Sequence, residues 1–250
     1  MNNQSRHNEI LNMLRSSGPM SAQDLSKNLY ISLSTIYRDL REMEQKKMII
    51  HSADGTLAFP GNNLYIPATY KTAINSEAKT ALAREAAKLI PEGATIHLDS
   101  SSTVSFMVDF IADRKDITVL TNSFFIAKKL IKANIPSYFC GGQIIDQSQT
   151  FGGRMGRFLM SQMEVDYMFF SPQSINNKGM IFDSVENDSR RDALKHAKTS
   201  VCLCDKSKVG QASFYHAASI RDIDYFITDA DLPAGFTKPR IRTIYVIPQQ

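Results

Sequence analysis

Apolar side chains near the start of the chain recur at helical spacing in three short segments. The positions that share this pattern are Ile10 and Leu14, then Ala22, Leu25 and Leu29, then Ile36, Leu40 and Met43. Ser21 with Asp24 predicts a capping box at the start of the second segment, and Ser32 predicts the N-cap of the third. Two further apolar runs flank Asp54-Gly55, a strong turn signal, and predict a β-hairpin. The pattern therefore predicts a trihelical core followed by a hairpin.

A different pattern begins in the second part of the chain. Residues 61–75 contain Pro67 and show no sustained period, so they predict a linker between a domain over 1–60 and a domain over 76–250. In the second domain, near-continuous apolar runs alternate with helical patterns. The predicted strands are 95–98, 117–120, 137–140, 165–170, 201–204, 223–227 and 243–247, and the predicted helices are 103–111, 124–132 and 189–197, after one that starts near Ser76. This alternation predicts an α/β domain with a mostly parallel sheet.

The third helix of the first domain carries a polar stripe opposite its apolar one. Ser34, Tyr37, Arg38 and Arg41 fall on this outer face. Their hydroxyl and basic groups suit phosphates and base edges in a DNA major groove. A helix, a short turn and a helix with a polar outer face are typical of the helix-turn-helix, and the hairpin makes it a winged one. The alternative, an ordinary helical hairpin with a solvated charged face, is disfavoured by the trihelical core and the hairpin.

Residues around this helix complete the predicted DNA-contacting set. Arg6 and His7 are predicted to precede the first helix, where a phosphate can be reached. The residues that we predict to contact DNA are Arg6, Ser32, Ser34, Thr35, Tyr37, Arg38 and Arg41. One recognition helix reads too few base pairs for genomic specificity, so we expect an oligomer with two half-sites.

Composition limits this picture without deciding it. The 250 residues are 43% hydrophobic, enough for one small and one larger core, and the net charge is +4. So small a basic excess is compatible with DNA binding, but the affinity must come from local placement of charge. The first residues lack an apolar signal-peptide region, and no run is long enough to span a bilayer. The three cysteines form no metal-ligand pattern, so we expect a cytoplasmic protein with no metal, no cofactor and no membrane association.

Polar loops follow four of the predicted strands. In open α/β sheets, ligands bind beyond the carboxyl ends of the strands, where such loops meet. The loops are 99–103, 121–123, 141–142 and 205–208. The first leads into a helix and combines hydroxyls with backbone N–H groups, which suits an anion. Each loop alone is a weak signal, and a serine run before a helix is more often a simple cap. Four polar loops that converge at one end of the sheet predict a site for a small, hydroxylated and phosphorylated ligand.

These loops receive separate roles in the predicted site. The hydroxyls of the first loop are expected to hold a phosphate with Lys208, because hydroxyls donate hydrogen bonds and the lysine neutralises charge. Asp99 would repel a phosphate, so it is assigned with Asn122 to a sugar hydroxyl. The full set predicted to bind the ligand is Asp99, Ser100, Ser101, Ser102, Thr103, Asn122, Ser123, Gly141, Gly142, Glu186, Lys206 and Lys208.

The sequence lacks the signatures of several common enzymes. It contains no G-x-G-x-x-G fingerprint, no Walker-type lysine loop, no G-x-S-x-G elbow and no H-E-x-x-H. His97 alternates with apolar neighbours, which favours a packed strand histidine over a base. The alternative to a DNA-binding protein is a sugar-phosphate isomerase or acyl-group transferase with an accessory domain, in which Glu186, Asp205 and Asp99 would act as acids and bases. Residues 1–60 distinguish the two, because an enzyme has no use for the polar stripe.

Together these motifs resemble the DeoR family of bacterial transcriptional regulators, over nearly the whole chain. The family's helix signature Thr-Ile-Arg-Arg-Asp-Leu corresponds to residues 35–40. Its Leu-Asp-Ser-Gly-Thr-Thr corresponds to residues 98–103. Its Thr-Asn-Ser, Gly-Gly and Asp-Ser-Ser-Lys correspond to 121–123, 141–142 and 205–208. This chain departs from the family at Tyr37, Lys47, Ser101 and Ser171–Ser174.

The resemblance implies both a fold and a function. Members typically bind double-stranded operator DNA as oligomers, so a dimer or tetramer is expected, and they respond to sugar phosphates. Their sensor domain is similar to the folds of ribose-5-phosphate isomerase and coenzyme A transferase, which implies this fold for 76–250. The resemblance thus implies a repressor of a carbohydrate-utilisation operon, controlled by a phosphorylated sugar, rather than an enzyme.

Overall fold

The computed structural model describes residues 3–17, 20–46, 48–51, 57–58, 71–72, 74–145, 150–177, 179–182, 189–210, 218–232 and 241–246. The chain divides into two compact units, Met1–Ile74 and Asn75–Gln250, and each has a core of its own. The linker predicted over 61–75 lies mostly outside the described residues. No helix in the described parts of the chain is long and apolar enough to cross a membrane.

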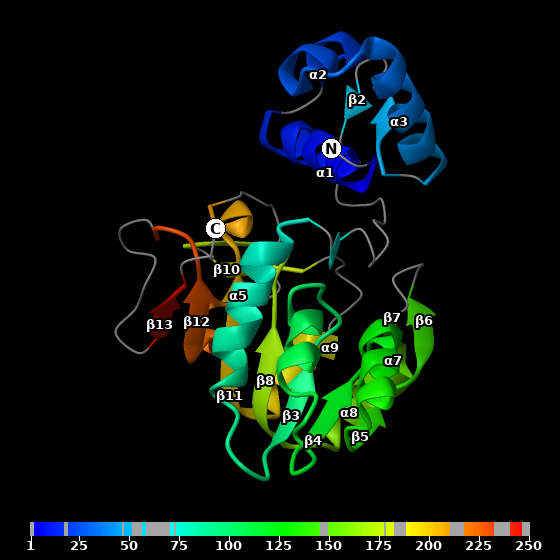
Figure 1. The fold of residues 1–250 in the computed structure, drawn as a ribbon. Helices are drawn as coiled ribbons and strands as arrows, with labels where there is room; N and C mark the ends of the chain where they lie inside the picture. The colour runs from blue at the N-terminus through cyan, green and yellow to red at the C-terminus, as the bar shows by residue number, and fades with distance from the viewer. Residues whose placement is uncertain are drawn as a thin grey trace. The chain divides into compact units, whose positions relative to one another are not determined.

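The described part of the N-terminal unit contains three helices and a hairpin, as the apolar pattern predicts (Figure 1). Its elements are α1 (Asn3–Ser17), α2 (Ala22–Leu29), α3 (Leu33–Gln45), β1 (Ile50–His51) and β2 (Leu57–Ala58). The two strands pair antiparallel. The predicted capping box of Ser21 and Asp24 is present, and the side chain of Ser32 caps α3. The predicted turn at Asp54-Gly55 lies outside the described residues.

One side of α3 packs into the core of this unit. Ile36, Leu40 and Met43 are buried together with apolar residues of α1 and α2. Burying side chains of this size contributes about 1.5–3 kcal/mol each relative to leaving them exposed. This burial orients the helix, so Tyr37, Arg38 and Arg41 face outward.

The first helix begins earlier than predicted. It starts at Asn3, so Arg6 and His7 lie inside α1 rather than ahead of it, which corrects the prediction. Arg6 Nε and Nη2 donate to the two carboxylate oxygens of Asp39 in α3, over 2.7 and 2.9 Å. His7 is buried beside the same carboxylate. The local pattern misses this helical turn because the partners that stabilise it come from α3.

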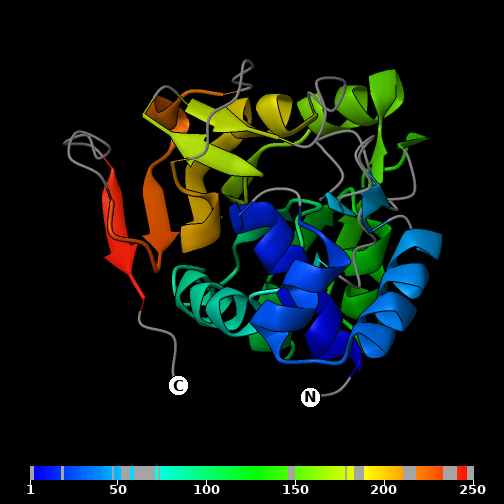
Figure 2. The same cartoon turned by 90° about the horizontal axis from the view of Figure 1, so that it is seen from above.

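In the C-terminal unit, the described residues form a seven-stranded sheet between two helical layers (Figures 1 and 2). The strand order is β13-β12-β11-β8-β3-β4-β5. The bounds are β3 (Thr95–Leu98), β4 (Thr118–Thr121), β5 (Ser137–Phe139), β8 (Val165–Phe170), β11 (Ala197–Cys204), β12 (Tyr225–Thr228) and β13 (Arg242–Tyr245). Every neighbouring pair is parallel. The predicted α/β domain with a parallel sheet is confirmed.

Helices cover both faces of the sheet (Figure 2). One face carries α5 (Ser76–Ala87), a short 3-10 helix (Val104–Phe106), α6 (Met107–Phe110) and α7 (Phe124–Ala133), and the other carries α8 (Gly153–Ser161) and α9 (Ser189–Lys195). Along β8, Phe169 packs into the first apolar layer, whereas Met168 and Phe170 pack into the second. Burial on both faces explains why this strand reads as a near-continuous apolar run.

The pattern does not predict two hairpins and α8. The hairpin strands are β6 (Gln143–Ile145) with β7 (Thr150–Gly152), and β9 (Ser174–Asn176) with β10 (Gly179–Ile181). Each has three residues, too few for a period to show. The structure also starts β11 at Ala197, inside the predicted helix 189–197, because the polar first half of the strand pairs with β8. The predicted helix 103–111 is divided into the 3-10 helix and α6.

Candidate DNA-binding surface and ligand site

The predicted DNA-contacting side chains lie on the outward side of α3. The exposed residues there are Ser34, Tyr37, Arg38 and Arg41. At the start of the helix, Ser32 Oγ lies 3.2 Å from Ser34 Oγ and 2.9 Å from Thr35 Oγ1. The helix thus presents hydroxyls at its N-terminus and two guanidinium groups further along. Because a helix N-terminus also favours a negative group, this face of α3 suits the phosphates of DNA.

Arg6 has a different position from the one predicted for a phosphate contact. Two of its guanidinium nitrogens are bound by Asp39, whose side chain is buried. The hydrogen bond from Arg6 to Asp39 raises the pKa of Arg6. A bidentate arginine–carboxylate pair is a strong charge-assisted contact. The structure thus uses Arg6 to join α1 to α3.

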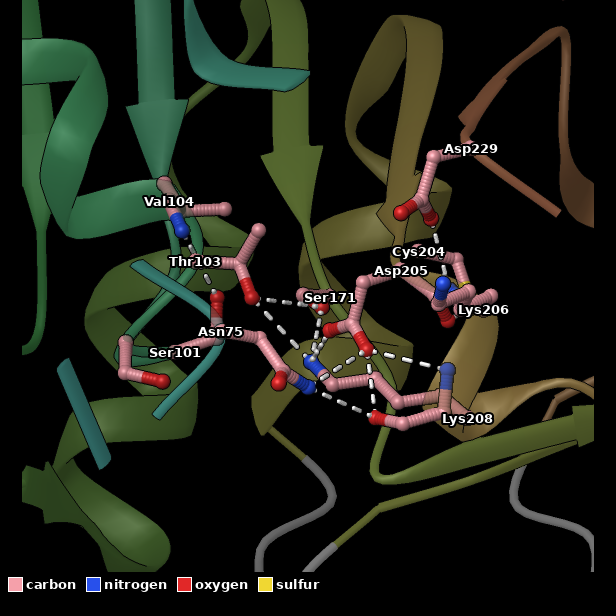
Figure 3. A network of polar contacts seen from close by, with 12 residues as sticks. Asn75, Ser101, Thr103, Val104, Ser171, Cys204, Asp205, Lys206, Lys208 and Asp229 are labelled. Atoms are coloured by element: carbon pink, nitrogen blue, oxygen red, sulfur yellow. Dashed lines mark hydrogen bonds and ion pairs between the residues drawn. The ribbon is translucent and has the colours of Figure 1, made fainter. Parts of the chain in front are cut away.

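Three neighbouring strands of the second unit, β3, β8 and β11, bring their carboxyl ends together. Lys208, after β11, donates to Ser171 Oγ after β8 over 2.7 Å and to Thr103 Oγ1 after β3 over 3.1 Å (Figure 3). Its Nζ also lies 3.7 Å from Asp205 Oδ2. Burial by itself would raise the pKa of Asp205, but Lys208, the hydrogen bonds from Ser207 and the charge of Lys79 together outweigh burial and lower it. The site therefore joins a cation, two hydroxyls and an ionised carboxylate.

Asp99 anchors the first loop of this site from the inside. Its side chain is fully buried, and Oδ1 accepts hydrogen bonds from the backbone N–H, over 2.9 Å, and the hydroxyl of Ser101. Oδ2 accepts from Arg190 Nε over 2.9 Å. Arg190 Nη2 donates to Ser100 Oγ over 3.0 Å, and its guanidinium lies 5.1 Å from the ring centroid of Phe182. Asp99 thus has partners within the protein, and its assignment to a sugar hydroxyl stays a prediction from the sequence.

The second and third polar loops hold a hairpin in place. Asn122 Nδ2 donates to Phe151 O over 2.9 Å, and Ser123 Oγ caps α7. Gly142 has a φ of +132°, and a Cβ added there would lie 2.3 Å from Gly152 O. Only glycine fits such a position. The structure therefore brings loops 99–103 and 205–208 into contact, whereas Asn122 binds the β6–β7 hairpin and Gly142 lies close against it.

Two further predicted residues, Ser102 and Lys206, belong to the loops of this cluster. Ser102 is half-buried and Lys206 is exposed. The backbone N–H of Lys206 donates to Asp229 Oδ1 over 2.7 Å (Figure 3), and burial raises the pKa of Asp229. Glu186 lies outside the described residues.

Two of the three acid and base candidates of the enzyme alternative lie among the described residues, and both are buried beside cations. Asp99 pairs with Arg190, and Asp205 lies beside Lys208. A general acid or base must reach the proton that it transfers. The arrangement suits carboxylates that order basic side chains around a bound anion.

Two residues of the site are absent from the predicted set. Arg190 comes from α9 and reaches Asp99 across 91 positions of the sequence, so no local signal reveals it. Ser171 lies in the segment that departs from the DeoR pattern, and its place directly after β8 is the signal that identifies it. The departure thus supplies a hydroxyl to Lys208.

His97 lies in β3 and is buried, as its alternation with apolar residues predicts. Neither ring nitrogen has a hydrogen-bond partner among the described residues. Burial, and then the charge of Arg190, lower the pKa of His97 to about 3. The ring is therefore neutral at physiological pH.

Comparison with known proteins finds matches in both units. A family described as an HTH domain matches residues 6–56, and one described as the DeoR C terminal sensor domain matches residues 74–230. A glycerol-3-phosphate regulon repressor of Escherichia coli (strain K12) is 25% identical over 92% of each chain. An L-fucose operon activator of Haemophilus influenzae is 28% identical over 92% of this chain and 93% of that protein. Among solved structures, ribose 5-phosphate isomerase A from Methanocaldococcus jannaschii matches with a TM-score of 0.42 and 19% identity, over 54% of this chain and 55% of that one.

Proposed function

The chain belongs to the DeoR family of transcriptional regulators, and from this premise we propose that it represses a carbohydrate-utilisation operon. A phosphorylated sugar would control its binding to double-stranded operator DNA. The observation that carries the proposal is the exposed polar and basic side of α3, opposite a buried apolar side. A DNA major groove accommodates such a helix, whereas an enzyme has no use for it. The relative named as a glycerol-3-phosphate regulon repressor supports the class of effector and the direction of control.

The direct test uses DNA selected by the full-length protein from a random pool. We expect one sequence class to be enriched, and fluorescence anisotropy should then show salt-dependent binding that a sugar phosphate weakens. A reporter gene behind the selected sequence should be transcribed less when the protein is present. Increased transcription would identify an activator, as the L-fucose relative is named, and no enrichment at all would contradict DNA reading.

The cluster around Lys208 supports an anionic effector. In the structure the lysine donates to two neutral hydroxyl acceptors, those of Ser171 and Thr103. A phosphate oxygen is a stronger acceptor, because charge-assisted hydrogen bonds are about twice as strong as neutral ones. We therefore propose that a phosphate lies between Lys208 and loop 99–103. Asp99 would act as a positioning residue, since it holds Arg190 against Ser100.

The phosphate is assigned to the hydroxyls of loop 99–103 together with Lys208. Six further ligand contacts stay predictions from the sequence, namely Asn122, Ser123, Gly141, Gly142, Glu186 and Lys206. The first four belong to the loops that the structure places against the β6–β7 hairpin or beside it.

Lys208→Ala and Ser102→Ala are each expected to weaken effector binding at least tenfold. A hydrogen bond to a charged group contributes about 1.5–3 kcal/mol, and about 1.4 kcal/mol is a factor of ten. The measurement is the rise in melting temperature as phosphorylated sugars are added, since a ligand of the native state stabilises it. Lys195→Ala, on the surface of α9, is the control and should respond as wild type. Wild-type affinity in both site variants would place the phosphate elsewhere, and both should bind DNA normally without effector.

We further propose that a dimer is the DNA-reading unit. Of the eleven exposed large apolar side chains among the described residues, seven lie on α7, β5, β6 and α8. These are Phe124, Ile131, Tyr138, Phe139, Ile144, Met155 and Phe158. Removing such a surface from water favours association between copies.

Light scattering is expected to give at least the mass of a dimer, and a footprint should cover two half-sites. Two-fold symmetric proteins read half-sites about one helical turn apart, or a multiple of that distance. A monomeric mass at working concentration, together with a footprint over a single half-site, would argue against the dimer.

A further inference from the structure

Tyr30 occupies a backbone conformation that tyrosine rarely adopts. It ends α2 and has φ 55° and ψ 39°, in the left-handed region. Glycine, or sometimes asparagine, is the usual residue at this position after a helix, because a Cβ is disfavoured there. The turn itself is held by neighbours, since Ile31 N donates to Ser26 O over 3.1 Å and Ser26 Oγ donates to Ile31 O over 2.6 Å. The turn thus needs a residue in the left-handed backbone conformation here, but nothing in the turn requires that residue to be tyrosine.

The side chain of Tyr30 brings no compensating burial. Tyr30 is 96% exposed, the highest value among the exposed large apolar residues of the described chain. An aromatic side chain stabilises a fold through the apolar area that it buries, and this one buries almost none. The strained backbone of Tyr30 therefore destabilises the folded state, and burial of its ring does not offset this. Strain of this kind points to a role outside the fold.

The position of Tyr30 indicates what that role is. It lies in the turn that leads into α3, two residues before the N-cap Ser32. Among the described residues of the N-terminal unit, the exposed large apolar side chains are Tyr30, Leu33 and Tyr37. Tyr30 lies in this turn, and Leu33 and Tyr37 lie in α3. They therefore belong to the same short segment as the hydroxyls and arginines of the predicted DNA surface. The unit thus concentrates its exposed aromatic groups where it presents its DNA-binding groups.

We propose that Tyr30 contacts the DNA backbone, with its phenol O–H donating to a phosphate oxygen and its ring packed on a deoxyribose. This inference rests on the proposed DNA-binding function and adds a contact outside the recognition helix. Tyrosine is one of the side chains that position a protein on the phosphate backbone without reading bases. Because a neutral phenol displaces no condensed counterion, this contact adds affinity but leaves the salt slope unchanged.

The test compares Tyr30→Gly, Tyr30→Asn and Tyr30→Phe in the full-length protein. The probe is a duplex selected from a random pool by the wild type, and the dissociation constant is measured at several salt concentrations. Glycine and asparagine both suit the left-handed backbone, but glycine loosens the turn more. We expect both to weaken binding by roughly tenfold at every salt concentration, with an unchanged slope and a melting temperature no lower than wild type. Phenylalanine keeps the ring and should fall between.

Several results would overturn the inference. Wild-type affinity in both the glycine and asparagine variants would remove Tyr30 from the interface. Weaker binding in the glycine variant alone would show that turn rigidity, not the ring, matters. A melting temperature several degrees lower in both variants would show a structural role.

The double variant Arg38→Ala, Arg41→Ala separates this inference from the proposed function. If it loses affinity while both Tyr30 variants bind normally, only the Tyr30 contact is wrong. If it too binds as wild type, the recognition surface itself is wrong.

Discussion

Replacing Arg38 and Arg41 together with alanine is expected to abolish tight operator binding. Both guanidinium groups are exposed on the outward side of α3, where no described acidic side chain pairs with them. An arginine that neutralises a phosphate contributes through counterion release, so each lost contact should reduce the slope of log affinity against log salt by about 1. A charged hydrogen bond adds about 1.5–3 kcal/mol, so the double variant should bind more than a hundredfold more weakly.

The measurement is fluorescence anisotropy with the selected duplex across a range of salt. Lys88→Ala with Lys195→Ala is the matched control, because it removes two exposed cations from the C-terminal unit. That control should keep the wild-type affinity and slope. Thermal unfolding should show that all three proteins are equally folded, since neither arginine is buried. An unchanged affinity and slope in the arginine variant would refute the assignment of α3 as the recognition helix.

Acidification from pH 7 to pH 5 is expected to remove about 2 kcal/mol of the free energy of unfolding through His97 alone. Burial and Arg190 lower the pKa of this ring to about 3 in the folded state, whereas an unfolded histidine titrates near 6.5. The unfolded chain therefore binds a proton that the folded chain excludes. This stability is fully present above about pH 6.5 and is lost progressively as the pH falls towards 3.

Urea unfolding followed by circular dichroism at pH 7, 6 and 5 measures this effect. Other groups titrate as well, so the informative quantity is the difference between wild type and His97→Leu. Leucine has a comparable size and removes two ring nitrogens that lack partners among the described residues, so the substitution should be close to neutral at pH 7. The variant should lose about 2 kcal/mol less than wild type between pH 7 and pH 5. If wild type and His97→Leu lost the same free energy of unfolding between pH 7 and pH 5, groups other than His97 would account for the loss.

The departures from the DeoR pattern acquire a physical meaning in the structure. Ser171 replaces a family residue yet donates its hydroxyl to Thr103 and accepts from Lys208. Ser101 stands where the family has a glycine, and its hydroxyl and N–H bind Asp99 from within the loop. Both departures therefore place hydroxyl groups in the network around Asp99 and Lys208.

Local signals in the sequence were sufficient to predict most of the elements. The spacing of Ile36, Leu40 and Met43 predicts both the existence of α3 and its outward face, and Ser32 predicts where it begins. The near-continuous apolar run over 165–170 predicts β8, whose bounds agree. The three-residue hairpin strands escaped prediction, because a segment so short has no measurable period.

Tertiary structure alone decided which polar residues became partners. Arg6 and Arg190 both stand in polar segments, and nothing nearby indicates that they bind Asp39 and Asp99, which lie 33 and 91 positions away. The first pair depends on how α1 packs on α3, and the second on how α9 packs on the sheet near the carboxyl end of β3. Helix and strand periods are set by the geometry of the chain over a few residues, so the sequence determined the elements and the faces that they bury. Buried ion pairs form between whichever charges packing brings together away from water, so the fold decided that Arg6 joins two helices, that Asp99 holds Arg190, and that Lys208 meets Ser171.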